Sequence, residues 1–385
     1  MDISDYKEEL RALNYKRKTI FSGSSPPEIF VGRHGYPNVY TGVLAPIEKG
    51  DTEKFSSPED WFKKQASINE IIEYRKKLIY PRFKSKIKDV RRGNNLLNAL
   101  NQISLSSKSV SAEFTLKKPA RFSPIKEPSV PFIGNPAPLK KIRLEENPKI
   151  LPAVDYITGD DRLKASDGIK GLYNKKIEIS GIIKILSAGL LGLKTQRKLV
   201  PTRWAITATD DTLSKEMLKS IRYFPEINSI EVFNSEYLGN HYEIILLPGK
   251  FEFEVIEISM KNKGVWQDNE GFLGRKTYAD SVTGAYYVNR LALCEYLMKI
   301  KRQCSCIFFR EVRPEYNVPL GVGILRENSR NAFLKKGEKF STIKEALNKI
   351  QERINLNVED FSLKSHILNN YGKQKRISEW FNQVK

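Results

Sequence analysis

Cysteine and histidine are scarce, because the 385-residue chain contains only three of each. Two of the cysteines, Cys304 and Cys306, are separated by a single residue, and no CxxC pair occurs. An odd number of cysteines with this spacing does not suggest a disulfide framework. Because the histidines are scattered along the chain, a structural zinc site built from Cys and His is not expected.

Long apolar segments are also missing. The longest candidate, residues 177–193, is interrupted by Lys184 and by three glycines, so a membrane-spanning helix is not expected there. The first ten residues are amphipathic and charged, unlike a signal peptide. These absences predict a soluble intracellular protein of the cytoplasm.

Acidic residues are outnumbered by basic ones. The chain carries 65 lysines and arginines against 45 aspartates and glutamates, which gives a formal net charge of +20. Such an excess creates a positive field that favours polyanions such as nucleic acid, nucleotides or an anionic membrane. The alternative is a lysine-rich surface that is simply solvated, so charge alone does not define a binding site.

The remaining composition indicates a globular α+β protein, with 40% hydrophobic and 10% aromatic residues. Alternating segments such as 251–260 and amphipathic segments such as 281–302 predict a mixed or antiparallel sheet core with flanking helices. Strands are also expected at 177–186 and 320–325. We expect a glycine-rich and helical lobe at 1–103, a proline-rich extended segment at 104–152, the α+β core at 153–366 and a flexible tail at 367–385.

A glycine- and proline-rich stretch at 21–42 predicts two short strands, 29–31 and 39–43, joined by a tight turn. Arg33 and His34 lie in this turn. Glycine lets backbone N–H groups approach an anion closely, and an arginine adds a fork of donors, so the turn is a candidate phosphate site. An ordinary turn is the alternative.

A second group of donors occurs at 194–211. Gln196, Arg197 and Lys198 are followed by Arg203 and Trp204, and the pattern after them predicts a strand. Arginine recognises phosphate through two parallel hydrogen bonds, and tryptophan stacks on a base. We therefore expect this stretch to bind nucleic acid or a nucleotide.

A polar, glycine-rich loop is expected at 263–279, and long loops with both signs of charge often carry ligand sites. Its candidate binding residues are Glu270, Arg275, Lys276 and Tyr278. Arg310 joins them at the end of a strand predicted from residue 304 to residue 312. Whether these side chains meet Arg33, Arg197 and Arg203 in one cleft decides between one composite site and several separate ones.

Carboxylates offer a metal-dependent alternative, since Mg²⁺ or Mn²⁺ prefers oxygen ligands and can activate water for phosphodiester hydrolysis. No nuclease signature fits their spacing, and capping or turn duty is the competing explanation. A metal-independent site using His34, His241 or Glu243 with arginines is a further possibility. The candidate metal ligands are Asp160, Asp161, Asp210, Asp211, Glu270 and Glu311.

The last dozen residues follow the pattern Gln, two residues, aliphatic, two residues, two aromatics. In one helical turn, Ile377, Trp380 and Phe381 would share a face, and Gln374 precedes them. This motif resembles the PCNA-interacting peptide, or PIP box, by which repair proteins bind the sliding clamp. The resemblance implies that Gln374 enters a polar pocket and the other three fill a hydrophobic one. A tail that folds back on its own domain is the alternative.

Four ordered motifs, together with this tail, resemble the archaeal Nre family of DNA-repair proteins. The resemblance implies participation in DNA repair at the nucleoid and docking on the clamp, but no catalytic residues. Some family members carry an N-terminal cysteine cluster suited to zinc, which this sequence lacks, so no zinc is expected. The motifs are 21–27 (FSGSSPP), 31–37 (VGRHGYP), 196–204 (QRKLVPTRW) and 274–279 (GRKTYA).

Three functions remain open at this stage. The first is a clamp-tethered repair protein whose basic core binds DNA or a nucleotide. The second is an enzyme that acts on nucleic acid or a nucleotide, with or without a divalent metal. The third is a repair adaptor without catalysis. The sequence does not determine the oligomeric state.

Overall fold

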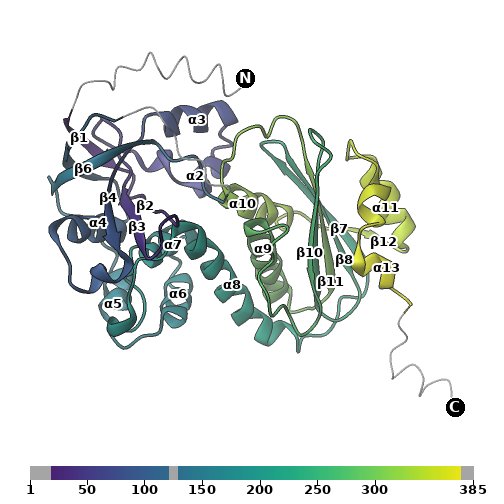
Figure 1. The fold of residues 1–385 in the computed structure, drawn as a ribbon. Helices are drawn as coiled ribbons and strands as arrows, with labels where there is room; N and C mark the ends of the chain where they lie inside the picture. Colours follow the sequence, from purple (N-terminus) through teal and green to yellow (C-terminus); the bar gives the residue numbers. More distant parts are fainter. Residues whose placement is uncertain (1–18, 121–128, 374–385) are drawn as a thin grey trace. The chain divides into compact units, whose positions relative to one another are not determined.

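The computed structural model describes residues 19–120 and 129–373, and the chain divides into two compact units (Figure 1). Unit 1 comprises Met1–Leu213 and Val318–Ile324, and unit 2 comprises Ser214–Asn317 and Leu325–Lys385. Both units contain helices and a sheet, which confirms the predicted α+β class.

Unit 1 is built on a six-stranded mixed sheet in the order β1-β5-β6-β4-β3-β2. Neighbouring strands are antiparallel except β4 and β6, which are parallel. Residues 104–152, expected to be extended, contribute two of the strands. The strands are β1 (Ile20–Ser25), β2 (Ile29–Val31), β3 (Asn38–Val43), β4 (Ile79–Lys86), β5 (Val110–Leu116) and β6 (Asn135–Leu144).

One face of this sheet is covered mainly by α4, whose Leu97, Leu100 and Ile103 are fully buried against strand residues. Capping side chains define several helix starts; Ser67, for example, closes a capping box with Glu70. The helical segments of unit 1 are η1 (Glu53–Phe55), α2 (Pro58–Lys63), α3 (Ile68–Lys76), η2 (Ile87–Arg91), α4 (Asn95–Leu105), α5 (Pro152–Gly159), α6 (Ala165–Asn174), α7 (Ile179–Ser187), η3 (Lys194–Gln196) and the first part of α8 (Thr202–Ile221).

Gly42 lies in the middle of β3, opposite Arg82 of β4. A Cβ atom added there would lie 2.0 Å from the carbonyl oxygen of Pro81, which a backbone atom cannot avoid by changing rotamer. We therefore expect Gly42→Ala to lower the free energy of unfolding by about 1–3 kcal/mol, as overpacking does. Urea unfolding checks this, with Gly159→Ala as a surface control in the same unit, because no atom lies within 4 Å of its added Cβ and its φ is not positive. Equal stability of the two variants would contradict the expectation.

Unit 2 contains a second six-stranded sheet in the order β10-β9-β11-β8-β7-β12. Neighbours are antiparallel except β9 and β11, which are parallel. The alternating segment at 251–260 forms one of these strands, β9, with a small shift of boundary. The strands are β7 (Ile230–Tyr237), β8 (Asn240–Leu247), β9 (Glu252–Ser259), β10 (Val265–Glu270), β11 (Ser305–Val312) and β12 (Glu338–Phe340).

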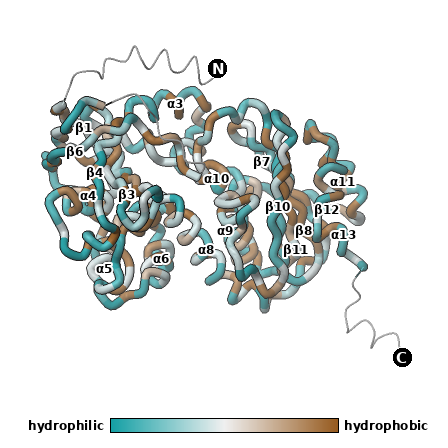
Figure 2. Tube along the Cα trace, in the orientation of Figure 1, coloured by the Kyte–Doolittle hydropathy of each residue, from teal (hydrophilic) through white to brown (hydrophobic). Residues whose placement is uncertain are grey.

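Helices cover both faces of this second sheet (Figure 1). On one face Phe309 stacks on Phe361 of α12, with ring centroids 5.0 Å apart. On the other face Phe253 packs edge-on against Tyr286 of α9. The inner strand β8 is therefore buried at every position, whereas the edge strand β10 is hydrophilic (Figure 2). The helices are α9 (Gly284–Ile300), α10 (Val322–Ala332), α11 (Ile343–Gln351), α12 (Val358–Ser362) and α13 (His366–Asn370).

Three predicted strands are wrong. Residues 177–186 lie mostly in α7, residues 320–325 lead into α10, and the stretch after Arg203 lies inside the long helix α8. Short apolar runs do not distinguish a buried strand from a buried helix, and the burial of α8 follows helical spacing instead. Within the described ranges, none of the helices is long and apolar enough to cross a membrane.

Candidate nucleic-acid interface

The β2–β3 hairpin and the start of α8 lie side by side in unit 1. The backbone N–H of Val31 donates to Oγ1 of Thr202 at 3.0 Å, which fixes the first turn of α8 beside the hairpin. The rings of Tyr36 and Trp204 then meet with centroids 5.2 Å apart. Both rings remain accessible, at 41% and 45% exposure, so they present aromatic surface to the solvent.

A third exposed aromatic side chain lies on the same hairpin. Tyr40 of β3 pairs directly with Lys84 of β4, and Arg82 lies two residues away on the same strand. The Arg82 guanidinium carbon is 4.4 Å from the Tyr40 ring centroid, and Lys84 Nζ is 5.6 Å from it. These distances are in the range of cation–π contacts, so the cations and the ring are held together.

Tyr36 and Tyr40 are separated by four residues, so their Cα atoms are within about 14 Å of each other. The two groups of rings and cations therefore lie on neighbouring parts of one hairpin, where Arg33 and Arg203 are half-buried. Aromatic rings stack on unpaired bases, and cations bind the phosphates between them. We call this set the hairpin surface, and it consists of Arg33, Tyr36, Tyr40, Arg82, Lys84, Arg203 and Trp204.

The other sequence-predicted residues of unit 1 have different roles. His34, Gln196 and Lys198 are exposed. Arg197 is turned inward, because its Nε donates to the Gly192 carbonyl at 2.9 Å and its Nη2 to the Thr158 carbonyl at 2.8 Å. Arg197 thus holds two loops together, which leaves less of its guanidinium for a phosphate.

In unit 2, Glu270 is buried at the end of β10 and forms an ion pair with Arg290 of α9. The two carboxylate oxygens lie 3.1 and 2.9 Å from Nη1 of Arg290. The backbone N–H of Arg275 also donates to Glu270, at 3.2 Å. Burial raises the pKa of Tyr286, whose ring lies against Arg275 and Arg290. Glu270 therefore holds α9 and the following loop onto the sheet edge.

Arg275 organises the loop that follows β10. Its Nη1 is 2.8 Å from Asp268 Oδ1 and 2.9 Å from the Asn269 carbonyl, and its Nη2 donates to the Tyr278 carbonyl at 3.1 Å. Lys276 is exposed. The structure thus brings Glu270, Arg275 and Tyr278 together, but through contacts that shape the loop.

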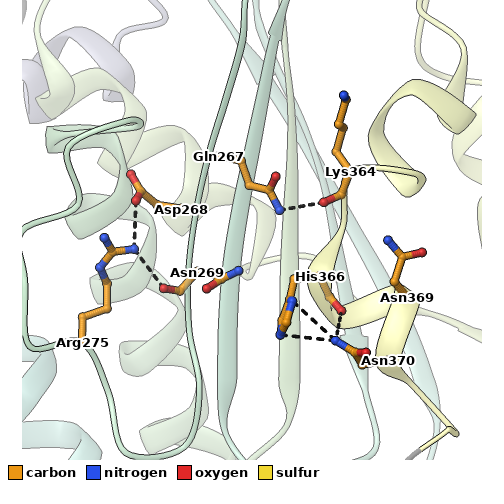
Figure 3. Close-up of a pocket in the computed structure, with 8 residues that line it drawn as sticks. All are labelled: Gln267, Asp268, Asn269, Arg275, Lys364, His366, Asn369 and Asn370. Carbon is orange, nitrogen blue, oxygen red and sulfur yellow. Dashed lines mark hydrogen bonds and ion pairs between the residues drawn. The ribbon is translucent and has the colours of Figure 1, made fainter.

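An open, polar pocket of about 650 Å³ lies between this loop and α13 (Figure 3). Gln267 Nε2 of β10 donates to the Lys364 carbonyl at 2.7 Å and so joins the two sides of the pocket (Figure 3). On the α13 side, the Asn370 amide donates to the His366 carbonyl at 2.9 Å. The side chains that line the pocket offer amide and cationic donors. It is lined by Gln267, Asp268, Asn269, Arg275, Lys364, His366, Asn369 and Asn370.

Arg310 is buried in β11 and does not join Glu270. Its Nη1 is 2.7 Å from Glu257 Oε1, and its Nε is 3.1 Å from Asn240 Oδ1. In the sheet, Arg310 lies beside Glu257 of β9, whereas Glu270 lies beside Phe253 of the same strand. Glu257 and Phe253 are four residues apart along β9, so Arg310 and Glu270 are separated by roughly 13 Å along the strand direction. Arg310 is therefore a structural residue of the sheet.

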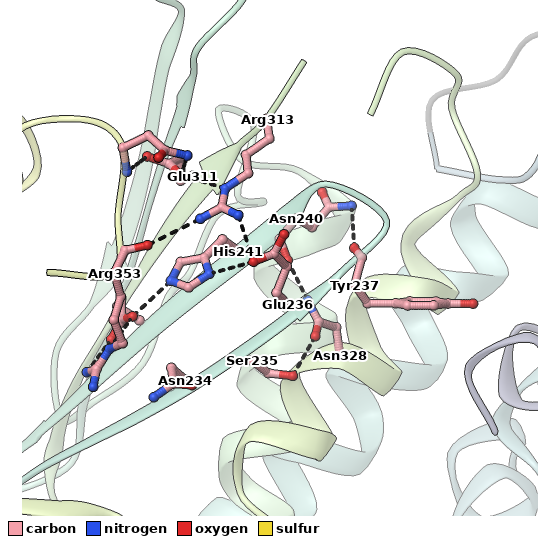
Figure 4. Close-up of polar contacts among 12 residues, drawn as sticks. Asn234, Ser235, Glu236, Tyr237, Asn240, His241, Glu311, Arg313, Asn328 and Arg353 are labelled. Carbon is pink, nitrogen blue, oxygen red and sulfur yellow. Dashed lines mark hydrogen bonds and ion pairs between the residues drawn. The ribbon is translucent and has the colours of Figure 1, made fainter. Parts of the chain in front are cut away.

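His241, Glu243 and Glu311 lie in one buried polar network of unit 2 (Figure 4). His241 Nε2 is 2.8 Å from Glu243 Oε1, and both oxygens of Glu243 accept from Arg353 at 2.9 Å. Glu311 accepts from Arg313 Nε at 2.8 Å. Because these carboxylates are already bound by arginines, the network supports the packing of α11 rather than a free base.

The remaining aspartates do not assemble a metal centre. Asp161 is held by Lys194 at 2.7 Å, and this hydrogen bond lowers the pKa of its carboxyl group. Asp160 caps a turn by accepting from the Arg162 N–H at 2.8 Å. Asp210 is fully buried inside α8, and Asp211 follows it there. Across residues 19–120 and 129–373, no group of three or more His, Cys, Asp or Glu side chains could hold a metal ion.

Tyr36 and Tyr40 are not among the candidate residues predicted from the sequence. Tyr36 belongs to a quoted motif, but only the packing of α8 onto the hairpin shows that it meets Trp204. Tyr40 is separated from Lys84 by more than forty residues, so their contact depends on strand register. The clamp-binding residues Gln374, Ile377, Trp380 and Phe381 lie outside the described residues and remain a prediction from the sequence.

Two family models match the chain, one described as archaeal Nre, N-terminal, over residues 2–267, and one as archaeal Nre, C-terminal, over residues 270–380. A DNA repair protein NreB of Archaeoglobus fulgidus is 36% identical over 366 residues, covering 93% of this chain and 91% of the relative. A DNA repair protein NreA of the same organism is 35% identical, covering 86% and 84%. A DNA repair protein NreA of Haloferax volcanii is 32% identical, covering 89% and 85%. No solved structure matches the chain.

Proposed function

Because this chain belongs to the archaeal Nre family, and the relatives it matches are named DNA repair proteins, we propose that it acts in DNA repair. In this proposal the hairpin surface of unit 1 binds single-stranded DNA. The C-terminal motif at 374–381 recruits the protein to the PCNA sliding clamp. The two activities are separate, so each has its own test.

The observation that carries the proposal is the grouping of exposed rings with cations on the hairpin surface. Tyr36, Tyr40 and Trp204 are each 40–45% exposed, although burial of such rings is normally favourable. Stacking of a base on an aromatic ring contributes about 1–3 kcal/mol. The faces of paired bases in a duplex are already stacked, so this surface favours single strands.

Attachment to the clamp strengthens weak DNA binding. Once the tail is bound, the core is confined near DNA, and its effective concentration reaches the millimolar range for a short flexible linker. The hairpin surface then needs only modest intrinsic affinity. The tail and the core then act together without any new contact between them.

Alanine replacement of Trp204 is expected to weaken binding of a fluorescent single-stranded oligonucleotide by roughly five- to 150-fold, the equivalent of one lost stacking contact. Fluorescence anisotropy measures this affinity. Tyr156→Ala is the matched control, because Tyr156 is also an exposed aromatic residue of unit 1, at 81% exposure. Unlike Trp204, it is followed closely by the acidic residues Asp160 and Asp161, so it is not expected to bind DNA. Equal weakening by both variants, or by neither, would exclude the hairpin surface as the site.

Salt dependence separates the phosphate contacts from the stacking contacts. Lys84→Ala should reduce the slope of log affinity against log salt concentration by about 0.7, the value for one phosphate contact on a single strand. Trp204→Phe should preserve both the slope and most of the affinity, because it retains an aromatic ring. A Lys84 variant whose slope is unchanged would argue against a phosphate at this position.

A further inference from the structure

A cavity of about 400 Å³ lies within unit 1, away from the hairpin surface residues. Its walls come from the β1–β2 turn, α2, the end of α4, the start of α5 and the N-terminal half of α7. Apolar side chains such as Leu105 and Ile185 form part of the lining, and serine hydroxyls and charged groups form the rest. A cavity of this volume and mixed lining is suited to a small polar organic molecule.

Lys184 of α7 is the basic residue set deepest in this lining. It is half-buried, because its neighbours Ile182, Ile183 and Ile185 pack into the interior of unit 1. Its Nζ donates to the carbonyl oxygen of Ser106 at 2.6 Å. Over the described parts of the chain, this is the one hydrogen bond that Nζ makes, and no carboxylate lies within ion-pair distance.

Two carboxylates that line the cavity, Glu28 and Glu53, are bound by other side chains. Glu28 pairs with Arg75, whose Nη2 lies 3.3 Å from Glu28 Oε1. Glu53 accepts from Lys108 Nζ at 3.2 Å and from the Ser109 backbone N–H at 3.2 Å. Burial therefore lowers the pKa of Lys184 to about 8, against a smaller opposing effect of Glu178, Glu53, Glu59 and Glu28.

We propose that Lys184 is a nucleophilic amine that condenses with an aldehyde bound in this cavity. The nitrogen lone pair adds to the carbonyl carbon to give a carbinolamine, and loss of the former carbonyl oxygen as water leaves an imine on Nζ. The step consumes no oxidant or reductant. Ser57, Ser180 and Glu178 also line the cavity and supply hydroxyl and carboxylate groups that can carry the protons.

The aldehyde can come from two sources that share this chemistry. One is a free small aldehyde. The other is the ring-opened sugar that remains in DNA where a base has been lost, and this source rests on the proposed repair function. A half-buried lysine with a single hydrogen bond would otherwise have a structural role, in which the amine only ties α7 to the end of α4.

The first experiment treats the full-length protein with glycolaldehyde and cyanoborohydride, which reduces an imine to a stable amine, and maps the modified lysines by peptide mass spectrometry. Because burial lowers the pKa of Lys184 to about 8, a larger fraction of Lys184 than of an exposed lysine is free amine at about pH 7.5. Because a less basic amine is also a weaker nucleophile, we expect Lys184 to be modified at least about tenfold faster than Lys176. The rate should rise through about pH 8 and then level off.

Lys176→Arg is the matched control, since Lys176 lines the same cavity but is exposed. Lys184→Arg keeps a cation and a donor for the Ser106 carbonyl but cannot form the imine. We expect selective modification in the wild type and the Lys176 variant and its loss in the Lys184 variant. Even modification of all lysines would overturn the proposal and leave Lys184 a structural residue.

The second experiment replaces glycolaldehyde with a single-stranded oligonucleotide that contains one abasic site. A covalent complex in the wild type that Lys184→Arg abolishes assigns the aldehyde to DNA. Modification by glycolaldehyde without a covalent DNA complex overturns the DNA source and leaves the free aldehyde. Anisotropy with an intact oligonucleotide reports the hairpin surface independently, so failure of this chemistry is distinguishable from failure of the proposed DNA binding.

Discussion

Alanine replacement of both Trp380 and Phe381 is expected to lower the affinity of the protein for the PCNA sliding clamp by roughly a hundredfold to a thousandfold. Large aromatic groups that fill a partner's pocket each contribute about 2 kcal/mol or more, and their effects are not strictly additive. The spacing of Ile377, Trp380 and Phe381 would place them on one face of a helical turn. Together they form the apolar anchor of the proposed clamp-binding motif.

Isothermal titration of the purified full-length protein with the clamp measures this effect. The control replaces Ser378 and Glu379 with alanine, because these residues occupy the two variable positions between the aliphatic and aromatic anchors. Neither variant should change the thermal unfolding of the core or the affinity of the isolated protein for single-stranded DNA. Wild-type clamp affinity of the aromatic variant would reject the motif and favour a tail bound to its own domain.

Local patterning predicted much of the secondary structure. The two-residue period of the segment at 251–260 became β9, and the glycine-rich stretch at 21–42 became the β2–β3 hairpin. Both structures depend on residues that are close together in the chain, within one strand or across one short turn, so a local sequence pattern is enough to predict them. The pairing of β4 with β6 in parallel joins segments about fifty residues apart, and no local signal specifies it.

The error in α8 shows why periodicity fails for mixed segments. The buried residues Ala205, Thr209 and Leu213 recur every four positions, which is helical spacing, but threonine and alanine give a weak hydrophobic signal. Asp210, which comes directly after Thr209, is fully buried within the same helix, although the pattern of the sequence predicts a strand there. Burial of an aspartate depends on its tertiary surroundings, and composition does not show these.

The candidate site could be predicted only in part for a related reason. Arg197 and Arg310 are candidates by sequence because arginine binds phosphate well, yet the same geometry lets arginine bind backbone carbonyls and buried carboxylates. From the sequence alone, Lys184 is notable only because it interrupts an apolar segment, and its position in a cavity is not predicted. Its altered environment arises from four other segments that surround it, and none of them is adjacent in the chain.

Glu270 gives the sharpest test of whether a sequence-predicted binding residue is structural. The Glu270 and Arg290 side chains are at most 2% exposed and form an ion pair with oxygens 2.9 and 3.1 Å from Nη1. Glu270→Ala leaves the Arg290 guanidinium buried without this carboxylate. We expect the free energy of unfolding to fall by about 3–5 kcal/mol, the cost of removing one partner of a buried pair.

Urea unfolding followed by circular dichroism measures this loss, and Glu352→Ala is the matched control. Glu352 pairs with Lys349 on the surface of α11, where such a pair contributes at most about 1 kcal/mol. The loss of unfolding free energy in Glu270→Gln should lie between the losses in Glu270→Ala and Glu352→Ala. The amide oxygen can still accept a hydrogen bond from Arg290, but the negative charge is lost. Residues held in place for ligand chemistry often reduce stability, so their removal is neutral or stabilising. An unchanged or higher stability of Glu270→Ala would therefore return Glu270 to the list of binding residues, whereas a large loss assigns it to the attachment of α9 to the sheet.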